Sequence, residues 1–323
     1  ELILAAGLAK PSNKGKRPYD TFRNRIIFPI RNPQGRCVGF GGRAMDTNDN
    51  AKYLNSPETE LFDKGRSLYN HGAAREATGT GHTLIVAEGY LDVIALTEAG
   101  FDAAVAPLGT AVTEMQLQLM WRVSDEPIIA LDGDTAGIRA AQRLIDLALP
   151  LLEAGKSLRF AAMPAGQDPD DLIRAGGPGA MQHLLDTARP MIDLLWEREV
   201  HGKNFDSPER KASLDKILRE KLQLIKDPSI RGYYGQAVKD MRWELFRPKM
   251  QSRKFIPKGG AAPAAAQATT RSSALASSSE HSHVLRQSVI LASLFKAPEA
   301  LAAVEGQLED LQFVKPQHRD MQQ

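Results

Sequence analysis

The sequence predicts an α/β protein, α+β overall, built around a largely parallel sheet flanked by helices. Between residues 83 and 163, apolar runs of strand length alternate with helical stretches, which is typical of βαβ units. Residues 1–82 are rich in turn residues and short β-like runs, which predicts a mixed α/β subdomain. Residues 180–250 carry helical periodicity and no convincing strand, so a helical subdomain is expected after the sheet.

Charge is unevenly distributed along the 323 residues, although the whole chain carries a net charge of only +2. Residues 1–75 hold 13 Lys and Arg against 7 Asp and Glu, whereas residues 84–175 hold 6 against 14. A basic segment followed by an acidic one indicates one surface that attracts polyanions and another that holds cations. A chance difference between neighbouring segments is the alternative.

Composition excludes several classes of protein. The single cysteine, Cys37, excludes a disulfide framework and a zinc site built on several cysteines, and it fits the reducing cytoplasm. No run approaches the roughly 20 apolar residues of a membrane helix, so no membrane partner is expected. The chain begins with Glu1 and not with Met, so we expect that residue 1 is not the natural start.

The basic segment contains a predicted hairpin. Residues 25–30 and 36–40 are β-like, and residues 31–35 between them (RNPQG) form a strong turn signal. Three glycines at positions 39, 41 and 42 follow, and they are expected to leave the backbone bare beside Arg43.

The elements of the sheet follow in order. Strands are expected at residues 83–87, 103–106, 127–131 and 158–163. Helices are expected at residues 91–99, about 113–122, and 136–153. A Ser-Pro-Glu-Arg sequence at 207–210 then predicts a helix start.

The expected domain organisation has five parts, of which the last two are short. Residues 1–82 form the basic subdomain, 83–175 the sheet domain and 176–255 the helical subdomain. Residues 256–283 are dominated by Ala, Ser, Gly and Thr, which predicts a flexible linker. Helical signal resumes at residues 284–323, which is too short for an independent domain.

Acidic residues follow three of the predicted strands. These residues are Glu88 and Asp92, then Asp132 and Asp134, then Asp168 and Asp170. The carboxyl ends of parallel strands lie at one edge of the sheet, so the acids should converge there. Because neighbouring carboxylates repel one another, some of them must be protonated or a cation must neutralise them. Oxygen ligands without His or Cys favour Mg²⁺ or Mn²⁺ over zinc, which suggests phosphoryl or nucleotidyl transfer or its hydrolytic reverse. Each acidic cluster by itself would also fit a turn or a helix start.

The acidic motifs resemble the Toprim domain of bacterial primases, type IA and type II topoisomerases and several nucleases. The motifs are EGYLD at 88–92, DGDTAG at 132–137 and DPD at 168–170. Flanking stretches narrow the choice: FRNRIIFPI at 22–30, GFGGR at 39–43, KYLNSPET at 52–59 and FDKG at 62–65. Together they resemble the bacterial DNA primases of the DnaG type, over about residues 1–250.

The resemblance implies synthesis of short RNA primers from ribonucleoside triphosphates on single-stranded DNA. It assigns Glu88 as the catalytic acid, Asp132 and Asp134 as catalytic metal-binding acids, and Asp92, Asp168 and Asp170 as the remaining acids of the metal site. It also implies a nucleotide- and template-facing set, which consists of Arg43, Lys52, Tyr53, Asn55 and Lys64. Tyr53 would stack on a base or simply pack, and each basic residue has a solvated surface charge as its alternative.

The resemblance also sets expectations about the ends of the chain. Zinc is expected only in the family's amino-terminal domain, which one cysteine cannot build, so the chain should be truncated at both ends. Residues 284–323 would begin a truncated helicase-interaction domain. The alternatives are a Toprim nuclease, which would share the acids but not residues 21–65, and a topoisomerase fragment, which would need a nucleophilic tyrosine. A non-catalytic scaffold is a further alternative.

Overall fold

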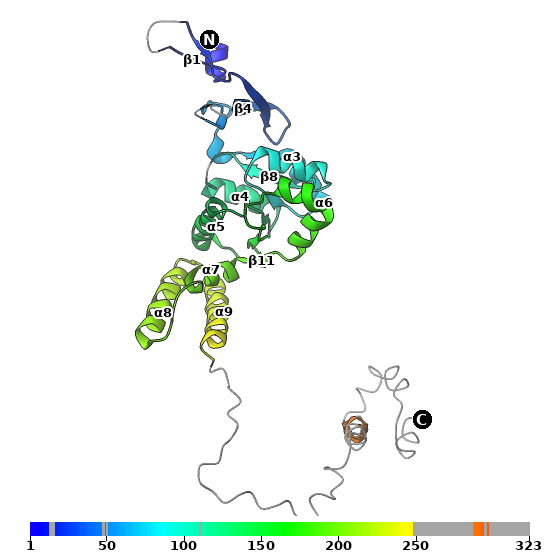
Figure 1. The fold of residues 1–323 in the computed structure, drawn as a ribbon, viewed down its shortest axis with the longest axis vertical. Helices are drawn as coiled ribbons and strands as arrows, with labels where there is room; N and C mark the ends of the chain where they lie inside the picture. Colours follow the sequence, from blue (N-terminus) through cyan, green and yellow to red (C-terminus); the bar gives the residue numbers. More distant parts are fainter. Residues whose placement is uncertain are drawn as a thin grey trace, which may run out of the picture. The chain divides into compact units, whose positions relative to one another are not determined.

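A computed structural model describes residues 1–12, 17–46, 49, 51–109, 111–247, 287–293 and 296. The chain divides into two compact units, residues 1–248 and 249–323 (Figure 1). The predicted linker at 256–283 and most of the segment 284–323 lie outside the described residues. The fold that positions the acidic residues belongs to the first unit.

The amino-terminal part is built from short strands. Helix α1 (Leu2–Ala5) precedes a small antiparallel pair, β1 (Ala9–Lys10) and β2 (Tyr19–Asp20). A three-stranded antiparallel sheet follows, formed by β3 (Arg25–Arg31), β4 (Cys37–Ala44) and β5 (Tyr53–Asn55). The predicted hairpin is confirmed: Asn32 Oδ1 accepts hydrogen bonds from the N–H groups of Gln34 and Arg36, and Gly35 has a φ of +78°.

The glycines of β4 serve a different purpose from the one predicted. Aromatic rings cover the strand, so its backbone is not bare. A Cβ atom at Gly41 would lie 2.6 Å from the ring of Tyr90, and one at Gly42 would lie 2.8 Å from Phe22. Glycine is therefore required because rings from elsewhere in the fold approach the strand closely.

The central sheet has six strands in the order β11-β10-β9-β7-β8-β6, and its four inner strands are parallel. The strands are β6 (Leu68–Tyr69), β7 (Ile85–Val86), β8 (Ala104–Pro107), β9 (Ile128–Ile129), β10 (Arg159–Phe160) and β11 (Arg189–Pro190). The edge strands β6 and β11 are antiparallel to their neighbours. The parallel sheet is thus confirmed, and the structure adds an antiparallel strand at each edge, outside the range 83–163.

Helices cover both faces of this sheet. They are α2 (His71–Gly79), α3 (Tyr90–Glu98), α4 (Glu114–Val123), α5 (Thr135–Ala148) and α6 (Pro169–Asp186), with 3-10 turns η1 (Lys64–Arg66) and η2 (Leu149–Leu151). Successive residues of β7 point to opposite faces. Val86 packs with residues of α4 and α5, and Ile85 packs with residues of α3 and α6, which lie on the other side of the sheet (Figure 1). Two apolar cores therefore fix the sheet between the helices.

Three further helices follow the sheet: α7 (Met191–Val200), α8 (Pro208–Gln223) and α9 (Pro228–Phe246). The predicted helix start is confirmed, because Ser207 caps α8 by accepting a hydrogen bond from the N–H of Arg210. Leu214, Leu218 and Val238 form a small core between α8 and α9. In the part of the chain that the structure describes, no helix is long and apolar enough to cross a bilayer.

Burial along α5 yields a direct test of the packing. Leu144 is 2% exposed in the core beneath the sheet, whereas Ile138 of the same helix is 56% exposed. We expect Leu144→Ala to lower the free energy of unfolding by about 2–5 kcal/mol, because it leaves a cavity. Ile138→Ala should change it by less than about 1 kcal/mol. Urea denaturation of both variants measures the difference, and equal losses would contradict this placement of α5.

Candidate active site

Carboxylates gather at one edge of the central sheet. The parallel strands β7, β9 and β10 end at Val86, Ile129 and Phe160, and an acidic residue follows each end. Glu88 lies in the turn before α3, Asp132 follows β9, and Asp168 precedes α6. Because the strands are parallel, all of these turns open at the same edge.

Two of these turns are held together by their backbones. The N–H of Gly133 donates to the carbonyl oxygen of Gln167, and the N–H of Gly166 donates to that of Gly133, both at 2.9 Å. A Cβ atom at Gly133 would lie only 2.0 Å from the carbonyl oxygen of Pro164. The glycine between the two aspartates therefore lets the turn after β9 approach the loop that leads to Asp168.

Three of the acids are fixed at the starts of helices. Asp92 accepts a hydrogen bond from the N–H of Gly89 at 2.9 Å in the first turn of α3, and it is only 7% exposed. Asp134 caps α5 by accepting from the N–H of Gly137. Asp168 caps α6 by accepting from the N–H of Asp171. Negative charge is favoured at helix starts, so the helices help to hold these acids in place.

The electrostatics show that the acids interact. Burial, together with the charge of Asp132, raises the pKa of Asp92 to about 7. Burial and the charges of Glu88 and Asp168 raise the pKa of Asp132 to about 6. The pKa of Glu88 is raised by partial burial and by Asp134, and lowered by the N–H of Asp132 and by Arg143. The carboxylates are therefore close enough to resist ionising together.

A divalent cation would fit this group of acids. Among the described residues, no three of the carboxylates converge closely enough to hold one ion by themselves. Magnesium, however, usually keeps several waters and needs only one or two carboxylates. Oδ1 of Asp132 is buried and finds no hydrogen-bond partner among the residues that the structure describes, which costs about 1–3 kcal/mol. A cation would supply that partner and reduce the repulsion between the acids.

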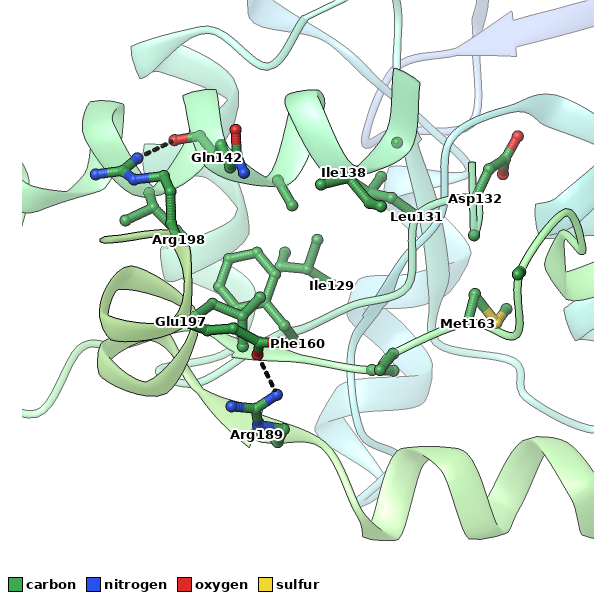
Figure 2. Close-up of a pocket in the computed structure, with 18 of the residues that line it drawn as sticks. Ile129, Leu131, Asp132, Ile138, Gln142, Phe160, Met163, Arg189, Glu197 and Arg198 are labelled. Atoms are coloured by element: carbon green, nitrogen blue, oxygen red, sulfur yellow. Dashed lines mark hydrogen bonds and ion pairs between the residues drawn. The ribbon is translucent and has the colours of Figure 1, made fainter. Parts of the chain in front are cut away.

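An apolar cavity of about 460 Å³ lies behind the turn after β9. Ile129, Ile138 and Phe160 line it, and Asp132 and Arg198 lie at opposite ends (Figure 2). Figure 2 shows the carboxylate of Asp132 turned away from the side chains of Ile129 and Phe160. The polar chemistry of Asp132 is therefore directed away from this cavity.

The basic residues of the amino-terminal sheet approach the same acids. Arg43 of β4 pairs across the sheet with Tyr53 of β5, with its guanidinium 5.9 Å from the ring centroid. Lys52 precedes Tyr53, and its charge lowers the pKa of Asp132. Burial raises the pKa of Tyr53, Arg43 opposes the shift, and the charge of Asp92 adds to it. These interactions bring β5 and the carboxylates into one site.

Three of the predicted site residues make other contacts. Asn55 accepts a hydrogen bond from the hydroxyl of Tyr90 at 2.5 Å. Asp170 forms an ion pair at 2.7 Å with Arg174, one turn further along α6. Lys64 lies in η1, and its carbonyl oxygen accepts from Nε2 of Gln116 at 2.9 Å. The turn that carries Lys64 is thus attached to the start of α4.

Sequence reasoning did not single out two arginines that act here. The charge of Arg143 of α5 lowers the pKa of Glu88. Arg25 of β3 holds the segment before Lys52 through an ion pair with Asp49 at 2.8 Å and a hydrogen bond to the carbonyl oxygen of Ala51 at 2.7 Å. Arg143 lies outside the quoted motifs, and the motif at 22–30 contains Arg25 but carries no signal for its contacts with Asp49 and Ala51.

Comparison with known proteins connects this geometry to a family. Residues 1–75 match the model of the DNA primase catalytic core, N-terminal domain, and residues 85–173 match a Toprim-like model. The DNA primases of Rickettsia bellii and Escherichia coli K12 are 43% identical over 253 residues and 39% identical over 236 residues. These alignments cover 77% and 73% of this chain, and 42% and 40% of those proteins.

Solved structures agree with the sequence matches. The catalytic domain of a DnaG primase bound to single-stranded DNA is 37% identical, with a TM-score of 0.68 and coverage of 74% of both chains. A DNA primase domain from Pseudomonas aeruginosa is also 37% identical, with a TM-score of 0.70 and coverage of 74% of this chain and 75% of that one. This chain belongs to the DnaG family of bacterial DNA primases.

Membership in the primase family confirms the resemblance and the fold expected from it. The chain spans about two fifths of the length of the curated primases that it matches. The matched ranges 1–75 and 85–173 contain both the basic strand β5 and the acids at the edge of the sheet. The two groups of residues that meet in the structure therefore fall within the two matched parts of the primase core.

The raised pKa of Asp92 predicts how stability depends on pH in the absence of metal. Between about pH 4 and pH 7 the folded chain binds more protons at Asp92 than the unfolded chain, so the free energy of unfolding falls as pH rises. The slope from this one group is at most about 1.4 kcal/mol per pH unit. Asp92→Asn, which can still accept from Gly89, should flatten the dependence.

Urea denaturation in the presence of EDTA over this pH range measures the slope. Asp102→Asn is the matched control, because Asp102 is exposed and lies away from the acidic edge. The control should keep the slope of the unmodified chain. An unchanged slope in Asp92→Asn would show that Asp92 does not titrate in this range.

Proposed function

We propose that this chain synthesises short RNA primers on single-stranded DNA by metal-dependent nucleotidyl transfer. The observation that carries the proposal is the position of Tyr53 and Lys52 beside the acidic edge: the ring centroid of Tyr53 is 6.4 Å from that of Tyr90 in the first turn of α3, and the charge of Lys52 acts on Asp132. A nucleotidyl transferase needs both groups, since the acids bind cations and the basic residues bind phosphates. Family membership supports the same activity.

The acidic residues would hold and activate the reacting groups. A bound Mg²⁺ or Mn²⁺ would neutralise phosphate charge at this site. The 3′ hydroxyl of the growing primer would attack the α-phosphate of a ribonucleoside triphosphate, and the bond to the β-phosphate would break with pyrophosphate as the leaving group. Asp132, Asp134 and Glu88 would hold the cations, and Asp92, Asp168 and Asp170 would complete the acidic site. Glu88, whose pKa is raised, would also accept the proton of the attacking hydroxyl.

The basic residues would bind the nucleotide and the template. Arg43, Lys52 and Lys64 would neutralise phosphates, and Tyr53 would stack on a base. Tyr53 of β5 and Lys52, which directly precedes the strand, are exposed, so a ligand can reach them. Asn55 would act on the nucleotide indirectly, through the hydrogen bond that it accepts from the hydroxyl of Tyr90.

The proposed partners are single-stranded DNA, ribonucleoside triphosphates and, through the carboxyl-terminal region, the replicative helicase. A solved relative bound to single-stranded DNA supports the first of these. We propose that the activity operates in the cytoplasm at replication forks. The proposed domain organisation keeps residues 1–82, 83–175 and 176–255 as subdomains of the core, before a linker at 256–283.

The test is incorporation of labelled ribonucleotides on single-stranded DNA, with Mg²⁺ and Mn²⁺ compared. Asp132→Asn should lower the rate by about 100-fold or more, because it removes a carboxylate that would hold the cation. Asp102→Asn, an exposed carboxylate outside the site, should keep the rate of the unmodified chain. The products should be short RNA chains.

A different product would contradict the proposal. Metal-dependent cutting of the DNA would indicate a Toprim nuclease, and a change of supercoiling would indicate a topoisomerase. Equal rates in Asp132→Asn and the unmodified chain would show that the acids do not perform the chemistry.

The role of Lys52 has its own test. Lys52→Ala should raise the KM for ribonucleotide by about 10-fold, equivalent to about 1.4 kcal/mol, because a charge facing the phosphates is lost. The effect should shrink as salt is added, since the exposed charge is screened. Lys239→Ala, on the exposed surface of α9, is the matched control and should leave KM unchanged. An unchanged KM in Lys52→Ala would show that Lys52 does not take part in binding the ribonucleotide.

A further inference from the structure

Tyr90 lies at the junction between the acidic edge and the amino-terminal sheet. It is the first residue of α3, between Gly89 and Asp92, and it is only 6% exposed. Its ring stacks on Phe28 of β3, with ring centroids 5.3 Å apart and planes inclined by 10°. It also meets Tyr69 of β6 edge to face at 4.8 Å. A single side chain therefore contacts both sheets.

The amino-terminal sheet presents one row of residues to this ring. Phe28, Gly41 and Asn55 are aligned across β3, β4 and β5. Phe28 provides the stacking surface, and the absence of a Cβ at Gly41 leaves room for the ring, since a Cβ would lie 2.6 Å from it. Asn55 provides the acceptor for the hydroxyl of Tyr90 at 2.5 Å. Stacking on Phe28 and the hydrogen bond to Asn55 thus hold the ring of Tyr90 in the room that Gly41 leaves for it.

The hydrogen bond is the contact that acts on β5. Burial raises the pKa of Tyr90 above its ordinary range, so the hydroxyl stays protonated and can donate. Tyr53 lies two residues before Asn55 on the same face of the strand, and its ring centroid is 6.4 Å from that of Tyr90. Lys52 directly precedes Tyr53 in the chain, and its positive charge partly offsets the raised pKa of Asp132. The strand ladder with β4 and the contacts of Arg25 hold β5 within its own sheet, and the hydrogen bond of Asn55 ties Tyr53 and Lys52 to the acidic edge.

We propose that Tyr90 is a positioning residue, which places the nucleotide-binding strand β5 over the carboxylates through its hydrogen bond to Asn55. The proposal rests on the proposed function, because it assigns β5 to ribonucleotide binding. In this proposal the amide oxygen of Asn55 accepts a hydrogen bond from Tyr90 and does not contact the nucleotide. Tyr90 itself contacts neither the acids nor the phosphates in this role.

The test is Tyr90→Phe, which removes the hydroxyl and keeps the ring between Phe28 and Tyr69. We expect the KM for ribonucleotide to rise about 5- to 10-fold with little change in kcat, because binding through β5 is lost while the acids stay in place. Tyr69→Phe is the matched control: it removes a hydroxyl from the same aromatic cluster without breaking the bond to Asn55, so KM should not change.

A double-mutant cycle tests whether the two residues act as a pair. Asn55→Ala should raise KM as much as Tyr90→Phe does, and the double variant should be no worse than either single variant. If Asn55→Ala weakens binding further in the Tyr90→Phe background, Asn55 contacts the nucleotide directly and the proposal is wrong. A fall in kcat with KM unchanged would also overturn it.

Equilibrium binding of a fluorescent ribonucleoside triphosphate with Mn²⁺ separates this proposal from the proposed function. If the unmodified chain binds the nucleotide but makes no RNA, the proposed function fails. The positioning role of Tyr90 can then still be tested, by comparing the nucleotide affinities of the unmodified chain and the Tyr90→Phe variant. If the unmodified chain makes RNA and the Tyr90→Phe variant binds the nucleotide equally well, only the positioning role fails. If the unmodified chain binds no nucleotide, β5 is not a nucleotide-binding strand and both proposals fall.

Discussion

The close approach of two loops at the carboxyl end of the central sheet determines the rest of the acidic site. The reciprocal hydrogen bonds of Gly133 with the segment 166–167 bring the turn after β9 against the loop before α6. Asp132 and Asp168 are thereby held near one another although like charges repel. Burial, together with this repulsion, raises the pKa values of Asp92 and Asp132. A fold that stores such repulsion at one edge is prepared to bind cations there.

The second constraint is the attachment of the amino-terminal sheet to this edge. It rests on hydrogen bonds from the starts of two helices. Tyr90 at the start of α3 binds Asn55 of β5, and Gln116 in the first turn of α4 binds the backbone of Lys64 and Ser67. Gln116 is fully buried, so its two donated bonds satisfy an amide that would otherwise be costly to bury. Both basic elements are thus placed relative to the acids by residues of the sheet domain.

Sequence patterns predicted the parallel strands, because each is an apolar run followed by a helix with its own start signal. They also predicted that the acids share an edge, since this follows from strand direction alone.

The two-residue strands β6 and β11 were not predicted. The predicted strands β7, β9 and β10 are equally short, but each lies within an apolar run of strand length, whereas no such run surrounds β6 or β11, and Pro190 of β11 suits only an edge strand. The glycines of β4 were misinterpreted, because the rings that cover them come from residues distant in the sequence. Contacts such as Tyr90 with Asn55 depend on packing between sheets, which no local pattern encodes.

The central claim is that the carboxylates at the edge of the sheet form a site for divalent cations. Calorimetric titration of Mn²⁺ into the chain tests it most directly, in buffers of different ionisation enthalpy. Because Asp92 and Asp132 have raised pKa values, binding should release protons at about pH 6, and the release should disappear by about pH 8. Asp132→Asn should weaken binding and reduce the release. Binding with no proton release at either pH, or equal binding in Asp132→Asn, would contradict the account.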